Sequence, residues 1–185
     1  MATAGERPII EEVAQDVFVY RNTCNVYVVR EGSEAVLIDF GDGSILDVLG
    51  EMGLRATDVL MTHHHRDQGQ GLHRAVKAGM RVWAPHAEVE LFTAIDARWQ
   101  GREIMNNYNM RQDRFSLLEP IPRAESLRDY RTYRFGGRSF TVVPTPGHTP
   151  GSITLLTESG GKRLAFTGDL IYGPGKVWSL SATQW

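Results

Sequence analysis

Residues 62–71 read T-H-H-H-R-D-Q-G-Q-G, and this stretch constrains the fold more than any other part of the chain. The apolar run at 59–61 directly before it is typical of the end of a buried strand. If the loop keeps the two-residue alternation of that strand, His63, His65 and Asp67 share one face and the residues between them point away. Two imidazoles and a carboxylate placed in this way suit zinc or another borderline divalent metal ion. The alternative is a polar surface loop without a ligand.

Two later stretches place further ligand-type side chains at strand ends. Residues 145–152 read T-P-G-H-T-P-G-S after an apolar run at 140–143, and the prolines and glycines predict a tight loop that holds His148 there. Residues 163–169 predict another strand, which ends in the carboxylate of Asp169. Because catalytic clusters are commonly assembled on the strand-end loops of a rigid sheet, these stretches predict a single site.

The order H-x-H-x-D, P-G-H-T-P-G-S and T-G-D resembles the metallo-β-lactamase-fold superfamily of metal-dependent hydrolases, and most closely its glyoxalase II-like branch. The resemblance runs from about residue 25 to residue 170. It implies a first metal site that here consists of His63, His65 and His148. It also implies a second site formed by Asp67, the residue after it and a more distal histidine, with Asp169 as a bridge between the two ions.

This chain departs from the family pattern at the second site. The residue after Asp67 is Gln68 where the family usually has histidine, and an amide oxygen is a weak ligand. No histidine follows Asp169 before Trp185. We therefore expect one firmly held zinc ion and a weakened second site, with iron or manganese as the alternative metals.

The resemblance also implies an α/β fold (α+β in some schemes), a four-layer αββα sandwich of two similar halves. We expect residues 1–185 to form a single domain that holds the first half and only the opening strands of the second. The chain would then be the N-terminal part of a longer domain or protein. A sheet face left uncovered and apolar would favour association with a second copy, which makes a homo-oligomer an expectation.

Local patterns agree with this architecture. The predicted elements are strands at 13–20, 25–29, 35–39, 57–61 and 81–84, helices at 44–52 and 67–78, and hairpins that turn at 136–137 and at 159–161. Asp39 starts an Asp-x-Gly that the resembling family places near its metals, and we interpret it as a hydrogen-bond partner of a ligand histidine. A turn-forming role is the alternative for Asp39.

Composition excludes several functional classes. A net charge of −2 leaves no electrostatic footprint for nucleic acid, and no run of about 18 apolar residues predicts a membrane span. The first residues lack the apolar core of a secretory signal, and a lone cysteine, Cys24, fits a reducing cytoplasm. The expected partner is a small-molecule substrate in the cytoplasm. Residues 96–122 are expected to form either a lid over it, with Trp99 and Tyr108, or an interface.

The resemblance implies hydrolysis by a metal-activated water, with Asp67 as the catalytic carboxylate that orients the water or takes its proton. The bond cleaved would be an ester, thioester, lactone, amide or phosphoester, and the sequence does not choose among them. Two alternatives belong to other classes. One is a mononuclear-iron sulfur dioxygenase, and the other is a degenerate, non-catalytic domain that acts in oligomerisation.

Overall fold

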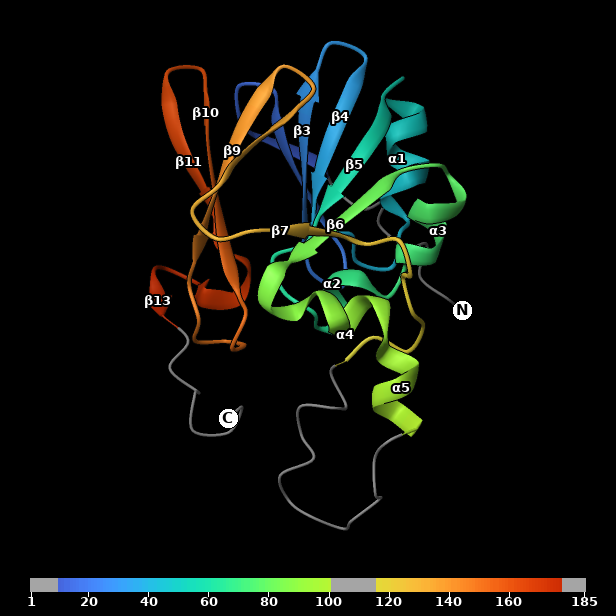
Figure 1. Cartoon of the computed structure of the whole chain (residues 1–185). Helices are drawn as coiled ribbons and strands as arrows, with labels where there is room; N and C mark the ends of the chain where they lie inside the picture. The colour runs from blue at the N-terminus through green and yellow to red at the C-terminus, as the bar shows by residue number, and fades with distance from the viewer. Residues whose placement is uncertain (1–9, 101–115, 178–185) are drawn as a thin grey trace, which may run out of the picture.

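Two β-sheets lie face to face in the computed structural model, and helices cover the outer face of the larger sheet (Figure 1). The structure describes residues 10–100 and 116–177. One apolar core fills the space between the helices and the larger sheet, and a second core fills the space between the two sheets. The α/β class and the layered sandwich predicted from the sequence are therefore confirmed.

The larger sheet has seven strands in their chain order, antiparallel from β1 to β4 and parallel from β4 to β7. The strands are β1 (Ile10–Ala14), β2 (Val17–Arg21), β3 (Asn25–Glu31), β4 (Glu34–Ile38), β5 (Arg55–Leu60), β6 (Arg81–Pro85) and β7 (Glu125–Leu127). The parallel strands β4, β5 and β6 end at the same edge, the lower one in Figure 1. The loop at 62–65, which follows β5, lies at this edge.

The single strand predicted at 13–20 is wrong, because a turn divides it into β1 and β2. Asp16 occupies that turn with a φ of 61°, a left-handed conformation that Asp tolerates better than most residues. Arg30 of β3 holds the turn from the neighbouring hairpin, since its backbone N–H donates to the Asp16 carbonyl at 2.8 Å and its guanidinium Nε to the Asp16 carboxylate at 2.8 Å.

The helices are short and follow the parallel strands. They are α1 (Ile45–Glu51), α2 (Arg66–Gly69), α3 (Leu72–Lys77), the 3₁₀ turn η1 (His86–Glu88), α4 (Val89–Thr93) and α5 (Ile95–Gln100). The continuous helix predicted at 67–78 is wrong, because the chain breaks at Gly71. There the loop after β4 packs against the backbone: Gly71 N–H donates to the Gly41 carbonyl at 2.9 Å, and a Cβ at Gly71 would lie 2.2 Å from the Asp42 carbonyl carbon. Tertiary packing thus divides the helix.

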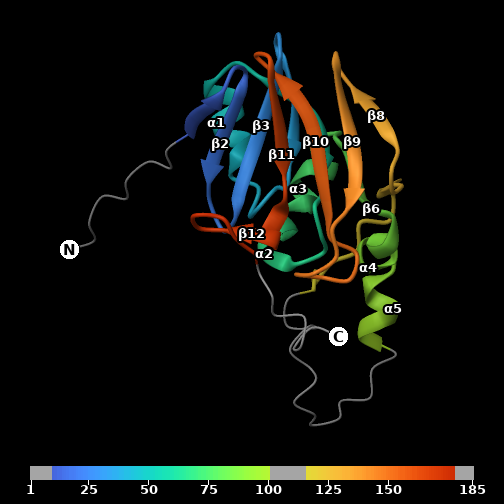
Figure 2. The same ribbon diagram turned by 90° about the vertical axis from the view of Figure 1, so that its left-hand side faces the viewer.

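The smaller sheet is antiparallel and has the order β11-β10-β9-β8 (Figure 2). Its strands are β8 (Thr132–Phe135), β9 (Arg138–Pro144), β10 (Ile153–Ser159) and β11 (Lys162–Phe166), followed by the 3₁₀ turn η3 (Gly168–Leu170) and a small ribbon of β12 (Ile171–Tyr172) and β13 (Lys176–Val177). Both predicted hairpins are confirmed, with Gly136 and Gly160 at positive φ in the turns.

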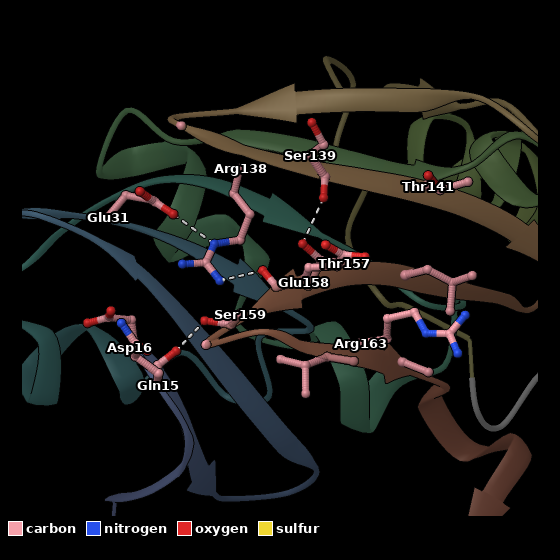
Figure 3. Close-up of a pocket in the computed structure, with 15 residues that line it drawn as sticks. Gln15, Asp16, Glu31, Arg138, Ser139, Thr141, Thr157, Glu158, Ser159 and Arg163 are labelled. Carbon is pink, nitrogen blue, oxygen red and sulfur yellow. Dashed lines mark hydrogen bonds and ion pairs between the residues drawn. The ribbon is translucent and has the colours of Figure 1, made fainter.

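The outer face of the smaller sheet bears no helix in the part of the chain that the structure describes (Figures 1 and 2). A groove of about 810 Å³ runs along it, and Figure 3 shows Arg138 at one end, between Glu31 and the backbone of Glu158. Most side chains of this lining are polar, and Leu156, which is 39% exposed, is a large apolar side chain among them. The homo-oligomer expected from the sequence stays a prediction.

The predicted lid residues Trp99 and Tyr108 lie outside the part whose side chains the structure describes, and the lid or interface stays a prediction. Among the described residues, no helix is both long and apolar enough to cross a membrane.

Candidate metal centre

The first ligand loop leaves the end of β5 at the lower edge of the larger sheet. Thr62, His63, His64 and His65 are all buried, which is unusual for four consecutive polar residues. The alternation of β5 holds as far as His65, because His63 and His65 contact each other while the ring of His64 turns towards Glu88. At Arg66 the backbone enters α2, so Asp67 extends from a helical turn and not from a continued strand.

The second ligand loop joins β9 to β10 and carries His148. Its proline- and glycine-rich sequence makes a tight turn, in which Gly147 N–H donates to the Thr149 carbonyl at 3.2 Å. The loop is tied to the first one, since Ile153 N–H donates to the Thr62 carbonyl at 3.0 Å. His65 and His148, which are 83 positions apart in the sequence, are thereby brought together.

Three imidazoles meet between these loops. One ring nitrogen each of His63, His65 and His148 lies within 4.8 Å of the other two. The ring centroids are 4.7 to 4.8 Å apart and meet edge to face, and His65 Nδ1 lies 2.9 Å from His148 Nε2. The sequence predicted these three residues as one ligand set, and the structure brings them together.

The electrostatics of the cluster favour neutral rings. Burial, and then the neighbouring histidines, lower the pKa of His63 well below its usual value and that of His65 to about 3. Burial also lowers the pKa of His148, against the nearby Asp67 and Glu88 charges, which raise it. Neutral imidazoles carry the nitrogen lone pairs that a metal ion needs.

Asp39 acts on His63 through Thr62. The Thr62 hydroxyl donates to the Asp39 carboxylate at 2.9 Å and lies 3.0 Å from His63 Nδ1. When Asp39 is ionised, as a cation at the histidines would favour, the one hydroxyl proton goes to Asp39, so His63 Nδ1–H is the donor to Thr62 and the lone pair lies on Nε2. That buried Nε2 atom has no hydrogen-bond partner among the described residues and faces the other two histidines. The donor set therefore fits a divalent metal ion.

The predicted hydrogen bond between Asp39 and a ligand histidine is thus indirect, because the Thr62 hydroxyl lies between the carboxylate and the His63 ring. Burial raises the pKa of Asp39 to about 8, although the hydrogen bonds from Thr62 lower it. A divalent cation at the histidines would lower the pKa further, because it favours the ionised carboxylate.

Asp169 reaches the cluster from the opposite sheet, on η3. Its Oδ2 atom lies 3.5 Å from His148 Nε2 and 4.0 Å from His63 Nε2. Gly168 allows this approach, because its φ is 53° and a Cβ there would lie 2.5 Å from the Thr62 hydroxyl oxygen. Burial raises the pKa of Asp169, against a hydrogen bond from Gln68 that lowers it.

Gln68 directs its amide nitrogen towards Asp169, donating to Oδ1 at 3.1 Å. A cavity of about 360 Å³ opens beside this pair, and Asp67 and Cys24 also line it. Burial, and then the charge of Asp169, raises the pKa of Asp67. The roles of Asp67 as catalytic carboxylate and second-site ligand stay predictions, as does that of Gln68. Burial raises the pKa of the Cys24 thiol, which opposes a role as nucleophile.

The sequence reasoning missed two residues that the structure places against the cluster. Thr62 joins Asp39 to His63, and Glu88 contacts both ligand loops from η1. Only Thr62 had a local signal, since it directly precedes the histidine run. Glu88 had none, because it lies 24 residues from His64 and 63 from Gly151 along the chain.

Comparisons with known proteins agree with this geometry. The sequence pattern of the family described as "Metallo-beta-lactamase superfamily" matches residues 19–182. A hydroxyacylglutathione hydrolase of Methylobacterium sp. (strain 4-46) is 29% identical over 138 residues, which are 73% of this chain and 42% of that protein. The acyl-coenzyme A thioesterase MBLAC2 of Homo sapiens is 29% identical over 174 residues, which cover 82% of this chain and 59% of the relative. This chain thus spans about half the length of these two relatives.

Among solved structures, a metallo-beta-lactamase with a HARLDQ motif from Cronobacter sakazakii superposes with a TM-score of 0.66 and 22% identity. The match covers 85% of this chain and 63% of that one, and at this identity it shows the fold alone. The named motif ends in the Asp-Gln pair that this chain carries at Asp67 and Gln68. The resemblance predicted from the three sequence motifs is confirmed by these matches.

Proposed function

Because the chain belongs to the metallo-β-lactamase superfamily, we propose that it is a hydrolase that depends on one divalent metal ion, most simply zinc. The observation that carries the proposal is the convergence of three neutral imidazoles, within 4.8 Å of one another, beside the Asp169 carboxylate. His63, His65 and His148 would hold the ion. When bound, such an ion supplies Lewis acidity, which polarises a substrate oxygen and makes a water more acidic.

The carboxylates at the cluster would orient the attacking water and accept its proton. Asp169 Oδ2 lies beside the histidine nitrogens, where it can accept a hydrogen bond from a water and orient it. Asp67 lines the adjoining cavity, and its raised pKa brings it closer to the working pH of a general base. Gln68 holds Asp169 by its other oxygen, so that the carboxylate keeps its orientation.

A thioester is the bond we propose for the substrate. Two relatives support this choice, since a hydroxyacylglutathione hydrolase and an acyl-coenzyme A thioesterase both cleave a carbonyl–sulfur bond by the meaning of their names. The cavity beside Asp67 and Asp169 includes the side chains of Asn22, Asn25 and Tyr27, which can hydrogen-bond an acyl group without forming an ion pair.

The test measures metal and activity on the same protein. Elemental mass spectrometry of protein purified without chelator or affinity tag should find about one zinc per chain. A panel of coenzyme A and glutathione thioesters, oxygen esters, a lactone, a β-lactam and a phosphodiester should then show thioester cleavage, read as release of free thiol, with the highest kcat/KM.

The other outcomes distinguish the alternatives. Iron in place of zinc, with oxygen uptake on a thiol substrate, would overturn hydrolysis in favour of sulfur oxidation. A folded protein that takes up no metal when zinc is added, and that cleaves none of the panel, would indicate a non-catalytic domain. Zinc with cleavage of another bond would overturn only the thioester.

A further inference from the structure

Glu88 is a buried carboxylate that lies between the two ligand loops. It ends the 3₁₀ turn η1, which follows β6, and its side chain is only 3% exposed. A carboxylate removed from water in this way is costly unless hydrogen-bond donors surround it. The identity of those donors therefore indicates what Glu88 does.

The donors come from both ligand loops. The backbone N–H of His64 donates to Glu88 Oε2 at 2.9 Å, and the ring Nδ1 of His64 lies 3.0 Å from the same oxygen. The backbone N–H of Gly151 donates to Glu88 Oε1 at 3.0 Å. His64 lies between the predicted ligands His63 and His65, and Gly151 follows His148 by three residues. Each carboxylate oxygen of Glu88 thus accepts a backbone hydrogen bond from a different ligand loop.

The fit between Glu88 and the second loop is close. A Cβ at Gly151 would lie 2.4 Å from Glu88 Cγ, so the Glu88 side chain rests directly on the backbone of that glycine. Burial by itself would raise the pKa of Glu88, but its contacts with His64, Thr149 and Gly151 outweigh burial and lower it. The group is therefore an ionised carboxylate that accepts hydrogen bonds on both oxygens.

We propose that Glu88 is a positioning residue of the metal centre: its carboxylate joins the His63–His65 loop to the His148 loop and so prearranges the three imidazoles for the ion. The inference rests on the proposed metal site. A carboxylate suits this position because both of its oxygens accept. An amide would present its NH₂ group to one of two backbone N–H donors, which leaves one loop without its hydrogen bond.

A matched pair of carboxylate-to-amide variants separates positioning from general stability. Asp58 of β5 is the control, since it is 1% exposed and accepts hydrogen bonds from Arg81 and Trp83, away from the ligand loops. Zinc affinity is measured by competition with a chromogenic chelator for wild type, Glu88→Gln and Asp58→Asn. The melting temperature is measured with and without zinc, and the visible spectrum is recorded after loading with cobalt(II).

Glu88→Gln should bind zinc 10- to 100-fold more weakly, which is the usual effect of removing a group that orients metal ligands. Its cobalt spectrum should also change, because the imidazoles are no longer held in one geometry. Asp58→Asn should lower the melting temperature while its zinc affinity stays within about twofold of wild type. Equal zinc affinity and identical cobalt spectra in Glu88→Gln and wild type would overturn the proposal.

A second variant and two measurements on wild type cover the remaining outcomes. If Glu88→Gln does not fold, Glu88→Asp keeps the charge but is one methylene too short to reach both loops, so it should still weaken zinc binding severalfold; wild-type affinity in that variant would refute the positioning role. Wild-type protein that binds no zinc would overturn both this inference and the proposed hydrolase. Weakened zinc binding in Glu88→Gln, with no hydrolysis by wild type, would leave Glu88 as proposed and overturn only the activity.

Discussion

The two ends of the sandwich treat their polar side chains in opposite ways. At the hairpin end, the upper one in Figure 1, charged groups pair at or near the surface: Arg30 with Asp16, and Arg138 with Glu31 at 2.7 Å. At the ligand end, three histidines crowd together in the interior, and a carboxylate approaches them. The charges at the hairpin end are paired with one another, whereas the ligand end gathers three imidazoles, which are side chains of the same kind.

This difference indicates which end has a function. Burying polar groups is costly, and a chain shaped only for stability would pair them or replace them with apolar residues. Conflicts of this kind within an otherwise consistent fold are expected at functional sites. The histidine cluster is such a conflict, and a metal ion would resolve it.

The largest expected effect is the loss of metal from His148→Ala. The variant keeps two imidazoles, which is too few for firm zinc binding, so the zinc content should fall from about one per chain to near zero. His63→Ala should behave in the same way. Elemental analysis after dialysis measures the effect, with Arg138→Ala at the other end as a control that keeps its zinc. Full zinc content in His148→Ala would show that the site is wrongly assigned.

The second effect is a pH dependence that has opposite signs at the two ends. The folded pKa of Asp39 is raised to about 8, so the folded metal-free protein holds a proton that the unfolded chain releases from about pH 4 upwards. Wild type therefore loses stability from this group as the pH rises from 4 to 8, by up to about 1.4 kcal/mol per pH unit, and Asp39→Asn does not. Relative to wild type, the variant should gain stability over that window.

Asp16 at the hairpin end provides the opposite case. Its pKa is lowered, mainly by the hydrogen bond from Arg30, so its contribution to stability is present above the unfolded pKa and is lost as the pH falls. Asp16→Asn should therefore lose stability relative to wild type as the pH rises through about 4. Urea unfolding in chelator at several pH values measures both variants. The same sign of pH dependence in both would refute the contrast between the two ends.

A smaller effect is expected from Gln68→Ala. The variant removes the amide that donates to Asp169 Oδ1, so the carboxylate is no longer held towards the histidines. Zinc affinity should fall by roughly tenfold, as is usual when a partner that orients a site is removed. Chelator competition measures it. An unchanged affinity would mean that Asp169 is held without Gln68.

The smallest effect belongs to the hairpin end. Arg138→Ala removes a partly exposed ion pair with Glu31 and a hydrogen bond to the Glu158 carbonyl. The free energy of unfolding should fall by about 1 kcal/mol, with zinc affinity unchanged. Denaturant unfolding and chelator competition on one sample measure both quantities. A change in zinc affinity would show that the two ends of the sandwich are coupled.

Several local patterns predicted the structure correctly, and others did not. The hairpins at Gly136 and Gly160 form as their turn residues indicate, because a turn depends on a few adjacent residues. The strand expected at 13–20 and the helix expected at 67–78 were both too long. In each case a contact from elsewhere in the chain, Arg30 at Asp16 and the loop after β4 at Gly71, imposes a break that periodicity does not reveal.

The sequence by itself determined which residues meet at the candidate centre. His63, His65, His148 and Asp169 each follow an apolar strand at a short loop, and strands packed in sheets bring such loops to a common edge. Only the tertiary structure decided what holds them: Thr62 between Asp39 and His63, Gln68 turned towards Asp169, and Glu88 between the loops. The physical reason is the separation along the sequence. A ligand motif consists of neighbouring residues, whereas a hydrogen bond across 23 to 101 positions exists only after the chain has folded.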